Sequence, residues 1–433
     1  MTFGNEQTKP FTFGARRLFA YVLLGFAYPS MIGLSCLQYV FYDAMILAMN
    51  ITNLQLGMFM TVNGIGALLL ALPGGILCDR MDCHKLLLIS LLISGLAGIA
   101  FALVTTYSVG LVVWSVFAVA MCGFYPSVFK VVRIIAPPEY AGRSFGLFGM
   151  CCAVGFIVTN LISLAVYDAV SLASGEVAGL SAVIWVFVAF LMVSSIVEYL
   201  LVRNIKPIDN EVVQTKMTVK DVIAVLKMPG TWLVFLTTFA IGSLRIAGGY
   251  FTPYFTSVLG TTLVFSGALA VFRQYGIRIL SSPFGGWLGD KIKSNSLIIA
   301  GGFFVSSLLV GIIMGLPSSA SIVVAIVLVL IFAFFDNMLV SLQYSILDEA
   351  LIPAKYTGTV LGIVTIVLPD LFVPAMFGSW LDSFGAGGYT AIFWFTIALD
   401  LLGMIGALIV WRRFRKGRIS EKGEGADVTD AEG

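Results

Sequence analysis

Residues 263–291 read LVFSGALAVFRQYGIRILSSPFGGWLGDK, a stretch that is long and apolar enough to cross a lipid bilayer. A bilayer core about 30 Å thick needs about 20 apolar residues in a helix. The stretch nevertheless carries Arg273 and Arg278 well inside its apolar run, and it ends in the glycine-rich segment Gly285–Lys291. These two features, the buried cations and the glycine-rich ending, lead to the expected site and the expected fold.

The composition predicts a polytopic membrane protein. Of the 433 residues, 59% are hydrophobic and 11% are charged, and the mean hydropathy is +1.00. A soluble domain is usually about 25% charged. The six cysteines lack metal-ligand spacing and are interpreted as reduced, apolar side chains, so no metal and no cofactor is expected. They are Cys36, Cys78, Cys83, Cys122, Cys151 and Cys152.

Twelve apolar runs predict an all-α fold of twelve transmembrane helices in two six-helix bundles. We expect them at residues 18–42, 54–77, 85–106, 109–132, 143–167, 182–202, 230–257, 263–288, 296–316, 320–346, 357–381 and 389–411. The polar connector between the sixth and seventh runs separates the halves. The expected parts are an N-terminal tail (1–17), an N-terminal bundle (18–202), a linker (203–229), a C-terminal bundle (230–411) and a disordered tail (412–433).

The basic residues predict the orientation. Of the 25 lysines and arginines, Arg245, Arg273 and Arg278 fall inside helices, and the rest fall in connectors or tails on the side of the termini. Positive loops stay in the cytoplasm. We therefore expect a multi-pass protein of the plasma (inner) membrane with both termini cytoplasmic.

The two halves repeat each other in sequence. The segment Pro73–Arg80 (PGGILCDR) returns 211 residues later as Phe284–Lys291 (FGGWLGDK). The segment Tyr140–Gly146 returns 216 residues later as Tyr356–Gly362. Two matches at nearly one offset indicate a duplicated six-helix unit, as in transporters that rock two bundles about a midplane site.

This pattern resembles the major facilitator superfamily, whose signature between helices 2 and 3 is Gly-x-Leu-Ala-Asp-Arg-x-Gly-Arg-Lys. The chain has Gly75, Leu77, Asp79 and Arg80 at the matching positions, whereas the later Gly-Arg is replaced by Asp82-Cys83. The resemblance implies the superfamily's two-bundle fold, related by a pseudo-twofold axis, and alternating access. The segments 123–143 and 358–370 also look like the anion-transporting branches, which carry organophosphates, nitrate and nitrite, or oxalate and related carboxylates.

The three arginines inside the helices predict an anion site. One arginine at mid-membrane costs about 2.5–3.5 kcal/mol on insertion scales, and its planar fork suits carboxylate, phosphate and similar oxyanions. Arg273 and Arg278 are five residues apart, about 140° around an α-helix. All three arginines are candidate substrate ligands. We favour Arg273 and Arg245 for this role, whereas Arg278 shares a small-residue face with Gly285 and Gly289 and is better explained as a packing residue. The alternative is a set of structural ion pairs with Asp336, Asp370 and Asp400.

No one branch of the superfamily matches this set of cations. Arg273 resembles the helix 8 arginine of nitrate-type members, but its repeat mate is Val62. Arg245 resembles the helix 7 arginine of organophosphate-type members, but helix 1 has none. Oxalate-type members have a lysine in helix 11, where this chain has Asp370. The resemblance therefore leaves the substrate open.

Neutral polar residues of the N-terminal half are expected to complete the binding site. They are Gln38, Tyr39, Asn63 and Tyr125. Asp336 and Asp370 are interpreted chiefly as partners of the arginines, and a role in proton coupling is the second interpretation.

Charged residues at the helix ends on the side of the termini predict a cytoplasmic gate. In the superfamily such a group latches one state, with Asp79 meeting the N-terminus of helix 11, where a carboxylate is favourable. The alternative is that these charges only set the topology. The predicted gate residues are Asp79, Arg80, Arg133, Arg143 and Asp290.

Together these patterns predict a secondary transporter of a small anionic solute, working as an antiporter or a proton symporter. No Walker loop, paired metal ligands or nucleophile motif indicates an enzyme. The expected partners are the anion, protons or a counter-anion, and the lipid bilayer, with no nucleic acid, and the protein is expected to be a monomer. Two alternatives remain: a carrier of a zwitterionic or neutral solute, and a transporter-like membrane sensor.

Overall fold

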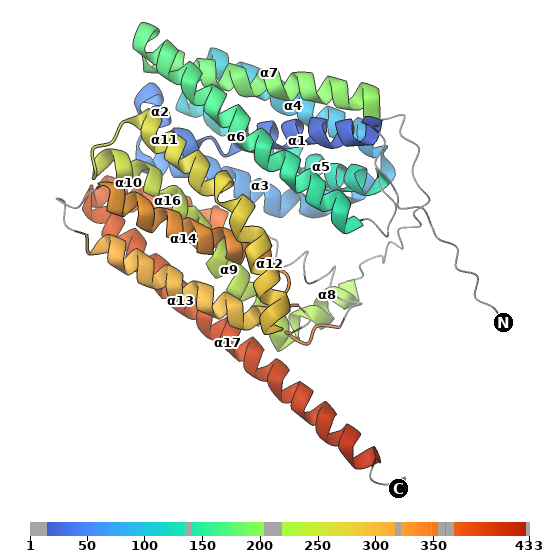
Figure 1. Ribbon diagram of the computed structural model, residues 1–433. Coiled ribbons are helices and arrows are strands. Elements are labelled where there is room, and N and C mark those ends of the chain that lie inside the picture. Colours follow the sequence, from blue (N-terminus) through green and yellow to red (C-terminus); the bar gives the residue numbers. More distant parts are fainter. Residues whose placement is uncertain are drawn as a thin grey trace.

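The structure is a computed structural model in which every regular element among the described residues is a helix. The described residues are 15–135, 141–202, 219–316, 322–347, 349–353, 360 and 368–429. Figure 1 shows two helical bundles side by side, the N-terminal one formed by α1–α7 and the C-terminal one by α9–α17. The all-α, two-bundle fold expected from the sequence is therefore confirmed.

The N-terminal bundle follows the expected order of apolar runs. Its helices are α1 (Ala15–Ser35), α2 (Gln38–Met49), α3 (Asn53–Arg80), α4 (Cys83–Leu103), α5 (Tyr107–Ile134), α6 (Ala141–Ser174) and α7 (Glu176–Val202).

The C-terminal bundle contains one π-helical turn among its α-helices. A short helix of the linker, α8 (Val219–Leu226), precedes the bundle. Its elements are α9 (Pro229–Gly249), α10 (Phe251–Ser257), α11 (Leu263–Val271), the π-helical turn η2 (Phe272–Gly276), α12 (Arg278–Ile292), α13 (Asn295–Met314), α14 (Ile322–Leu342), α16 (Leu368–Phe384) and α17 (Gly387–Thr429).

Eleven segments of the described chain are long and apolar enough to cross a membrane. The remaining expected span, the eleventh at residues 357–381, lies partly outside the described residues, and α16 is described from Leu368. The sequence also favoured a disordered tail from residue 412, whereas α17 continues as a helix to Thr429. No proline interrupts this tail, and lysines and arginines are good helix formers.

The first apolar run of each half forms a broken helix. In the N-terminal half α1 ends at Ser35 and α2 begins at Gln38, and the indole N–H of Trp114 donates to the Ser35 carbonyl at 2.9 Å. In the C-terminal half the break falls at Tyr250, whose hydroxyl donates to the Pro374 carbonyl at 2.8 Å. A broken helix leaves backbone groups that other helices must satisfy inside a membrane. Trp114 and Tyr250 bring these breaks into contact with neighbouring helices.

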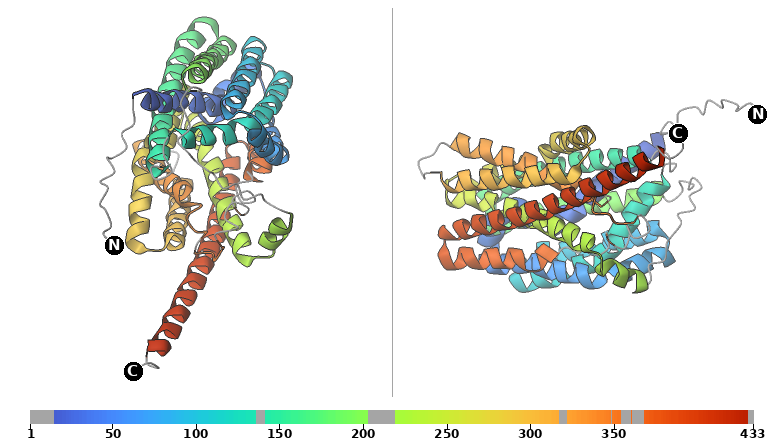
Figure 2. Two further views of the ribbon diagram at one scale, coloured as in Figure 1. Left: turned by 90° about the vertical axis from the view of Figure 1, so that its right-hand side faces the viewer. Right: turned by 90° about the horizontal axis from the view of Figure 1, so that it is seen from below.

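The two bundles are held together most closely where α3 meets α16. A Cβ atom on Gly57 would lie 2.4 Å from the Pro374 carbonyl oxygen, and one on Gly378 would lie 2.2 Å from that of Asn53. Such contacts require glycine, because any side chain would overlap the opposite backbone. Figures 1 and 2 show the bundles close together near α2 and α10 and spread apart toward the other end of the helices.

Candidate functional site

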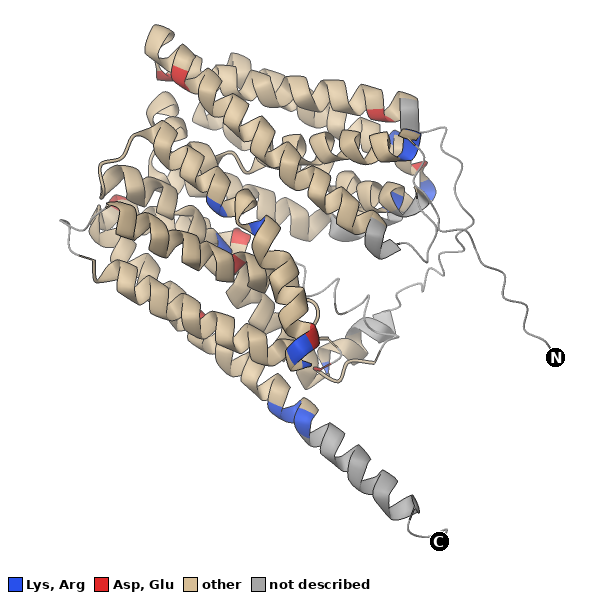
Figure 3. Ribbon diagram, in the orientation of Figure 1, with Lys and Arg blue, Asp and Glu red and all other residues tan. Residues whose placement is uncertain are grey.

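Lysines and arginines gather at one end of the helix bundles, called the basic end below and marked by Arg80, Lys130, Lys291 and Arg412. Figure 3 shows further basic residues away from that end, inside the bundles. They are Arg245 on α9, Arg273 on η2 and Arg278 at the start of α12. The distribution agrees with the pattern of charges in the sequence.

A π-helical turn separates Arg273 from Arg278. The Ile277 N–H donates to the Phe272 carbonyl at 2.9 Å, five residues earlier, instead of closing an α-helical turn. The side-chain amide of Asn337 on α14 donates to the Arg273 carbonyl at 3.2 Å. Short π turns inside α-helices occur often at functional sites. The angle of about 140° expected for a regular α-helix therefore does not describe these two arginines.

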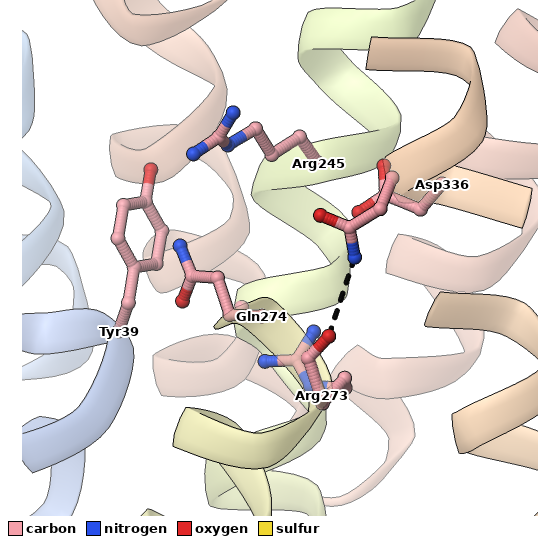
Figure 4. A pocket seen from close by; sticks show the side chains of 7 residues that line it. Tyr39, Arg245, Arg273, Gln274 and Asp336 are labelled. Atoms are coloured by element: carbon pink, nitrogen blue, oxygen red, sulfur yellow. Dashed lines mark hydrogen bonds between the residues drawn. The ribbon is translucent and has the colours of Figure 1, made fainter. Parts of the chain in front are cut away.

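A small pocket lies between the two bundles, and Figure 4 shows the side chains that line it. The residues labelled there are Tyr39, Arg245, Arg273, Gln274 and Asp336. Gly249 and Asn337 complete its lining. The space is about 10 Å³, room for about one water molecule. A larger solute would therefore need the surrounding side chains to move.

The arginines are not neutralised by direct ion pairs. Among the described residues, no carboxylate oxygen lies within 4.0 Å of a guanidinium nitrogen of Arg245, Arg273 or Arg278. Arg273 is only 5% exposed, and its Nη2 atom has no hydrogen-bond partner. Asp336 Oδ1 and Gln274 Oε1 are also buried without partners. The pocket therefore contains both a free cationic donor and free acceptors.

The charges of the site interact at longer range. Asp336 interacts electrostatically with all three arginines, and Asp370 interacts with Arg245. With both carboxylates ionised, the three guanidinium groups leave one positive charge uncompensated. Such a charge inside a membrane protein is expected to face water or a ligand.

Arg278 does not lie in a packed seam between helices. Its side chain is exposed, and it interacts electrostatically with Arg245, Tyr28 and Tyr275. Arg278 therefore lacks the packed surroundings that the sequence pattern favoured, and its role as a substrate ligand stays a prediction. It belongs to the same charged group as the other two arginines.

The expected neutral ligands from the N-terminal half lie in different environments. Tyr39 lines the pocket, and Gln38 is buried with Oε1 unpartnered. Asn63 is buried on α3, also with its side-chain oxygen unpartnered. Tyr125 is 38% exposed and interacts electrostatically with Arg245. Of these four residues, Tyr39 alone contributes to the lining of the described pocket.

The third aspartate considered as an arginine partner interacts electrostatically with Asp336 but with no arginine of the described residues. Asp400 on α17 is fully buried, and both of its carboxyl oxygens lack a hydrogen-bond partner. Asp370 is half-buried at the start of α16, and its backbone lies 3.1 Å from the position of a Cβ atom on Gly64. The alternative of three matched ion pairs is therefore not what the described residues show.

The predicted gate can be followed only in part. The side chains of Asp79, Arg133 and Arg143 lie outside the described residues, and those of Arg80 and Asp290 are exposed. At this end Lys130 donates to the Cys78 carbonyl at 3.0 Å, within the N-terminal bundle. The gate at the basic end stays a prediction.

A clasp that joins the two bundles at the opposite end was not predicted. Asp382 of α16 accepts hydrogen bonds from the Asn53 N–H at 2.9 Å and the Leu54 N–H at 2.8 Å, at the N-terminus of α3. It also accepts one from the Asn53 side-chain amide at 2.8 Å. Burial acts to raise the pKa of Asp382, but these hydrogen bonds outweigh it and hold the pKa below its ordinary value.

Further contacts close the same end. Thr256 of α10 donates to Asp43 of α2 at 2.7 Å, and Thr252 donates to the Tyr39 carbonyl at 3.1 Å. Thr256 follows the helix break at Tyr250, and Tyr39 follows the break after Ser35. The broken helices of the two halves therefore meet each other at this closed end. Only tertiary contacts reveal this, because Asp382 reads in the sequence as an ordinary loop charge.

The fold and the arginine-containing site between two repeated bundles define a membrane transport protein. The sequence profile of the Major Facilitator Superfamily matches residues 17–368, and the chain belongs to this family. The chain is 25% identical over 403 residues to the inner membrane protein YqcE of Escherichia coli (strain K12), covering 90% of this chain and 93% of the relative. It is 24% identical over 395 residues to the inner membrane protein YihN of the same organism, covering 88% and 92%.

Solved transporter structures share the fold at low sequence identity. A bacterial homologue of the human lysosomal transporter Spinster, in an inward-facing and occupied conformation, matches with a TM-score of 0.73 and 14% identity, covering 93% of this chain and 99% of that one. The nucleoside transporter NupG matches with a TM-score of 0.68 and 13% identity, covering 91% and 99%. These likenesses support the fold.

Proposed function

We propose that this protein is a secondary active transporter of a small anionic solute, which it moves by alternating access between its two bundles. The observation that carries the proposal is the group of three arginines inside the bundles, for which the described residues supply no carboxylate oxygen within 4.0 Å. Arginine is the side chain best suited to grip a carboxylate, phosphate or similar oxyanion with two parallel hydrogen bonds.

Arg273 and Arg245 are the proposed primary ligands. Both line the pocket, and Arg273 holds an unpartnered, buried Nη2 atom there. Arg278 belongs to the same group of charges and its side chain is exposed, so it is suited to attract the anion before binding. Asp336, in the same pocket, limits the excess of positive charge when no substrate is bound.

The contacts between the bundles support an assignment of conformational state. The clasp of Asp382 and the hydrogen bond between Thr256 and Asp43 lie opposite the basic end. By the positive-inside rule the basic end is cytoplasmic, and the names of the E. coli relatives favour the inner membrane. We therefore assign this structure to a state closed toward the exterior. Asp79, Arg80, Arg133, Arg143 and Asp290 would then latch the cytoplasmic ends in the opposite state.

Coupling is proposed to act through the same charges. An anion that neutralises the arginines would free Asp336 to take up a proton, which makes proton symport possible. Exchange with a second anion needs no proton, because either anion can occupy the arginines in turn. The dependence of uptake on an imposed proton gradient, compared with preloaded counter-anion, separates the two modes.

The central experiment measures ligand binding and uptake by purified protein in proteoliposomes. We expect an anion that stabilises the protein against heat to be taken up, and we expect Arg273→Lys and Arg245→Lys to lose most of this uptake. Lysine keeps the charge but loses the two-pronged geometry. Lys293→Arg, at an exposed position on the basic end, is the control. Transport at the wild-type rate by both arginine variants would overturn the anion site.

A zwitterionic solute is the second candidate, because Asp336 and Asp370 both lie within electrostatic range of Arg245. An ammonium group could then sit beside a carboxylate while the arginines hold the anionic group. Competition by amino acids against simple carboxylates distinguishes the two candidates. Stronger competition by amino acids would favour the zwitterion.

A further inference from the structure

A continuous row of aromatic rings lines the N-terminal bundle opposite the arginines. We call Tyr28, Tyr125, Phe129 and Phe156 the aromatic wall. The ring centroids of Tyr28 and Tyr125 are 6.3 Å apart, and those of Tyr125 and Phe129 are 6.5 Å apart. Tyr28 also meets Phe156 edge-on at 6.3 Å. The wall thus extends over α1, α5 and α6.

Two of the four rings of the aromatic wall are exposed. Tyr125 is 38% exposed and Phe129 is 39% exposed. The buried rings of Phe124 and Phe148 pack against the ring of Tyr28, with centroid distances of 5.6 Å each. A supported, partly exposed aromatic surface offers a rigid, flat face to a ligand.

The wall faces the charged group of the C-terminal bundle. Tyr28 interacts electrostatically with Arg278 and Arg245, and Tyr125 interacts with Arg245 and Asp370. Phe156 stacks on Tyr275 of η2 with a centroid distance of 4.2 Å and an interplanar angle of 6°. Tyr275 is the side chain where the aromatic and the charged surfaces join.

Hydroxyl groups are abundant here and lack partners. Within the part of the chain that the structure describes, none of five tyrosine hydroxyls in this region makes a hydrogen bond to the protein, although each interacts electrostatically with Arg245. They belong to Tyr28, Tyr39, Tyr125, Tyr275 and Tyr344. Gln274 adds a buried, unpartnered amide oxygen. Polar groups in such a place are expected to be satisfied by water or by a ligand that brings its own donors and acceptors.

We infer that the solute is a cyclic sugar acid: a hydroxyl-bearing ring that carries a carboxylate, phosphate or sulfonate group. Its anionic group would lie on the arginines, the apolar face of its ring on Tyr28 and Tyr125, and its hydroxyls against the tyrosine and glutamine side chains. The inference rests on the proposed function, because it names the substrate class of the same site.

Simpler anions fit the observed surfaces less well. A small dicarboxylate or an inorganic oxyanion would use the arginines but leave the aromatic wall without a partner. A hydrophobic aromatic acid would use the wall but leave the tyrosine hydroxyls and Gln274 Oε1 unsatisfied, which is costly once the site closes. A neutral sugar would leave the arginines uncompensated.

A matched set of probes tests each part of the proposal by thermal stabilisation and direct binding. Glucuronate and glucose 6-phosphate carry both ring and charge, glucose has the ring only, gluconate is an open-chain hydroxylated anion, benzoate is a ring without hydroxyls, and succinate has charge alone. We expect the strongest binding from the first two. Each other probe is expected to bind about tenfold more weakly, which corresponds to a loss of about 1.4 kcal/mol, because each lacks a stacking, ionic or hydroxyl contact.

The outcomes separate this inference from the proposed function. If gluconate or succinate bound as tightly as glucuronate, the requirement for a ring would be wrong. If benzoate bound as tightly as glucuronate, the requirement for hydroxyl groups would be wrong. The anion site would stand in both cases. Equal binding of glucose and glucuronate, unchanged in Arg245→Gln, would overturn the anion site as well. Failure of both cyclic sugar acids to bind would overturn the inference, and succinate binding in the same assay would keep the anion site.

Variants of the aromatic wall supply the second test. Tyr125→Leu should weaken glucuronate binding by about tenfold and leave succinate binding unchanged, whereas Tyr125→Phe keeps the ring and should lose less. Phe26→Leu is the control, because Phe26 stacks on Phe190 at 5.8 Å within the N-terminal bundle and is not part of the wall. Equal effects of Tyr125→Leu on glucuronate and succinate would show a structural role and overturn the stacking contact.

Discussion

Arg273 lies within one π-helical turn and Arg278 begins the α-helix that follows it; in this turn the Ile277 N–H donates to the Phe272 carbonyl at 2.9 Å. This hydrogen bond joins residues five apart in sequence, whereas the hydrogen bonds of an α-helix join residues four apart. Both arginines consequently interact with Asp336 and Tyr275, although a regular α-helix would point them in different directions. The site depends on this irregularity.

Asn337 is expected to maintain the π turn, because its side chain donates to the Arg273 carbonyl at 3.2 Å. Asn337→Leu removes the donor and leaves a buried acceptor, at a cost of about 1–3 kcal/mol. We expect lower thermal stability and a loss of substrate binding that ligand concentration restores only in part. Val327→Ala, at an exposed position on α14, is the control and should bind normally. Wild-type affinity in Asn337→Leu would show that the turn forms without this hydrogen bond.

The Asp382 clasp should bias the transporter toward the state seen here. A carboxylate at a helix N-terminus contributes about 0.3–1 kcal/mol, so Asp382→Asn should shift the population toward a state open at this end. The measurement is labelling of a cysteine introduced at Leu54, in the Asp382→Asn background and in the otherwise wild-type protein. Faster labelling in the variant is expected. Asp168→Asn, at an exposed acidic position near the end of α6, should leave the rate unchanged.

The same clasp predicts how the closed state depends on pH. Hydrogen bonds lower the pKa of Asp382 in the closed state, so the clasp is fully formed above the ordinary aspartate pKa of about 3.9 and is lost as the pH falls through the lowered value. Labelling at Leu54 should therefore be constant between about pH 5 and 8 and rise only in stronger acid. A transition near neutral pH would assign this gating to another group.

The glycines between α3 and α16 should be essential for closure. Gly378→Val places carbon where a Cβ atom would already lie 2.2 Å from the Asn53 carbonyl oxygen. We expect a protein that inserts into the membrane and fails to transport, because its bundles cannot approach. Gly301→Val is the matched control, since no heavy atom lies within 4 Å of a Cβ atom there. Normal transport by Gly378→Val would mean that α3 and α16 can separate without loss of function.

Trp114 is expected to stabilise the broken first helix. It donates to the Ser35 carbonyl at 2.9 Å and stacks on Phe59 with a centroid distance of 4.6 Å. Trp114→Phe keeps an aromatic ring but leaves the carbonyl without this donor, at about 1–3 kcal/mol. Thermal unfolding in detergent should show lower stability than for Trp185→Phe, at an exposed position on α7. Equal stability of the two variants would assign the break to other contacts.

The sequence predicted the apolar helices well, because length and hydropathy are local properties. The expected run 263–288 corresponds to α11, η2 and α12 together, which end at Ile292. Its ending, Gly285–Lys291, matched the repeat and led to the family. The π turn was not predicted, because it depends on contacts such as that from Asn337 and leaves no hydropathy pattern. Of the aromatic wall, Tyr125 alone was predicted from the sequence as a site residue, since which rings meet depends on tertiary contacts between α1, α5 and α6.

By itself the sequence determined that this chain crosses the membrane many times, that its halves are duplicated and that cations replace Val62 and Ala67 of the first half at Arg273 and Arg278 of the second. Each of these follows from residue type and spacing along the chain. Tertiary structure alone decided which side chains share the site and which end is closed. Those facts depend on contacts across more than 300 residues of sequence, such as Asn53 with Asp382, which no local pattern encodes.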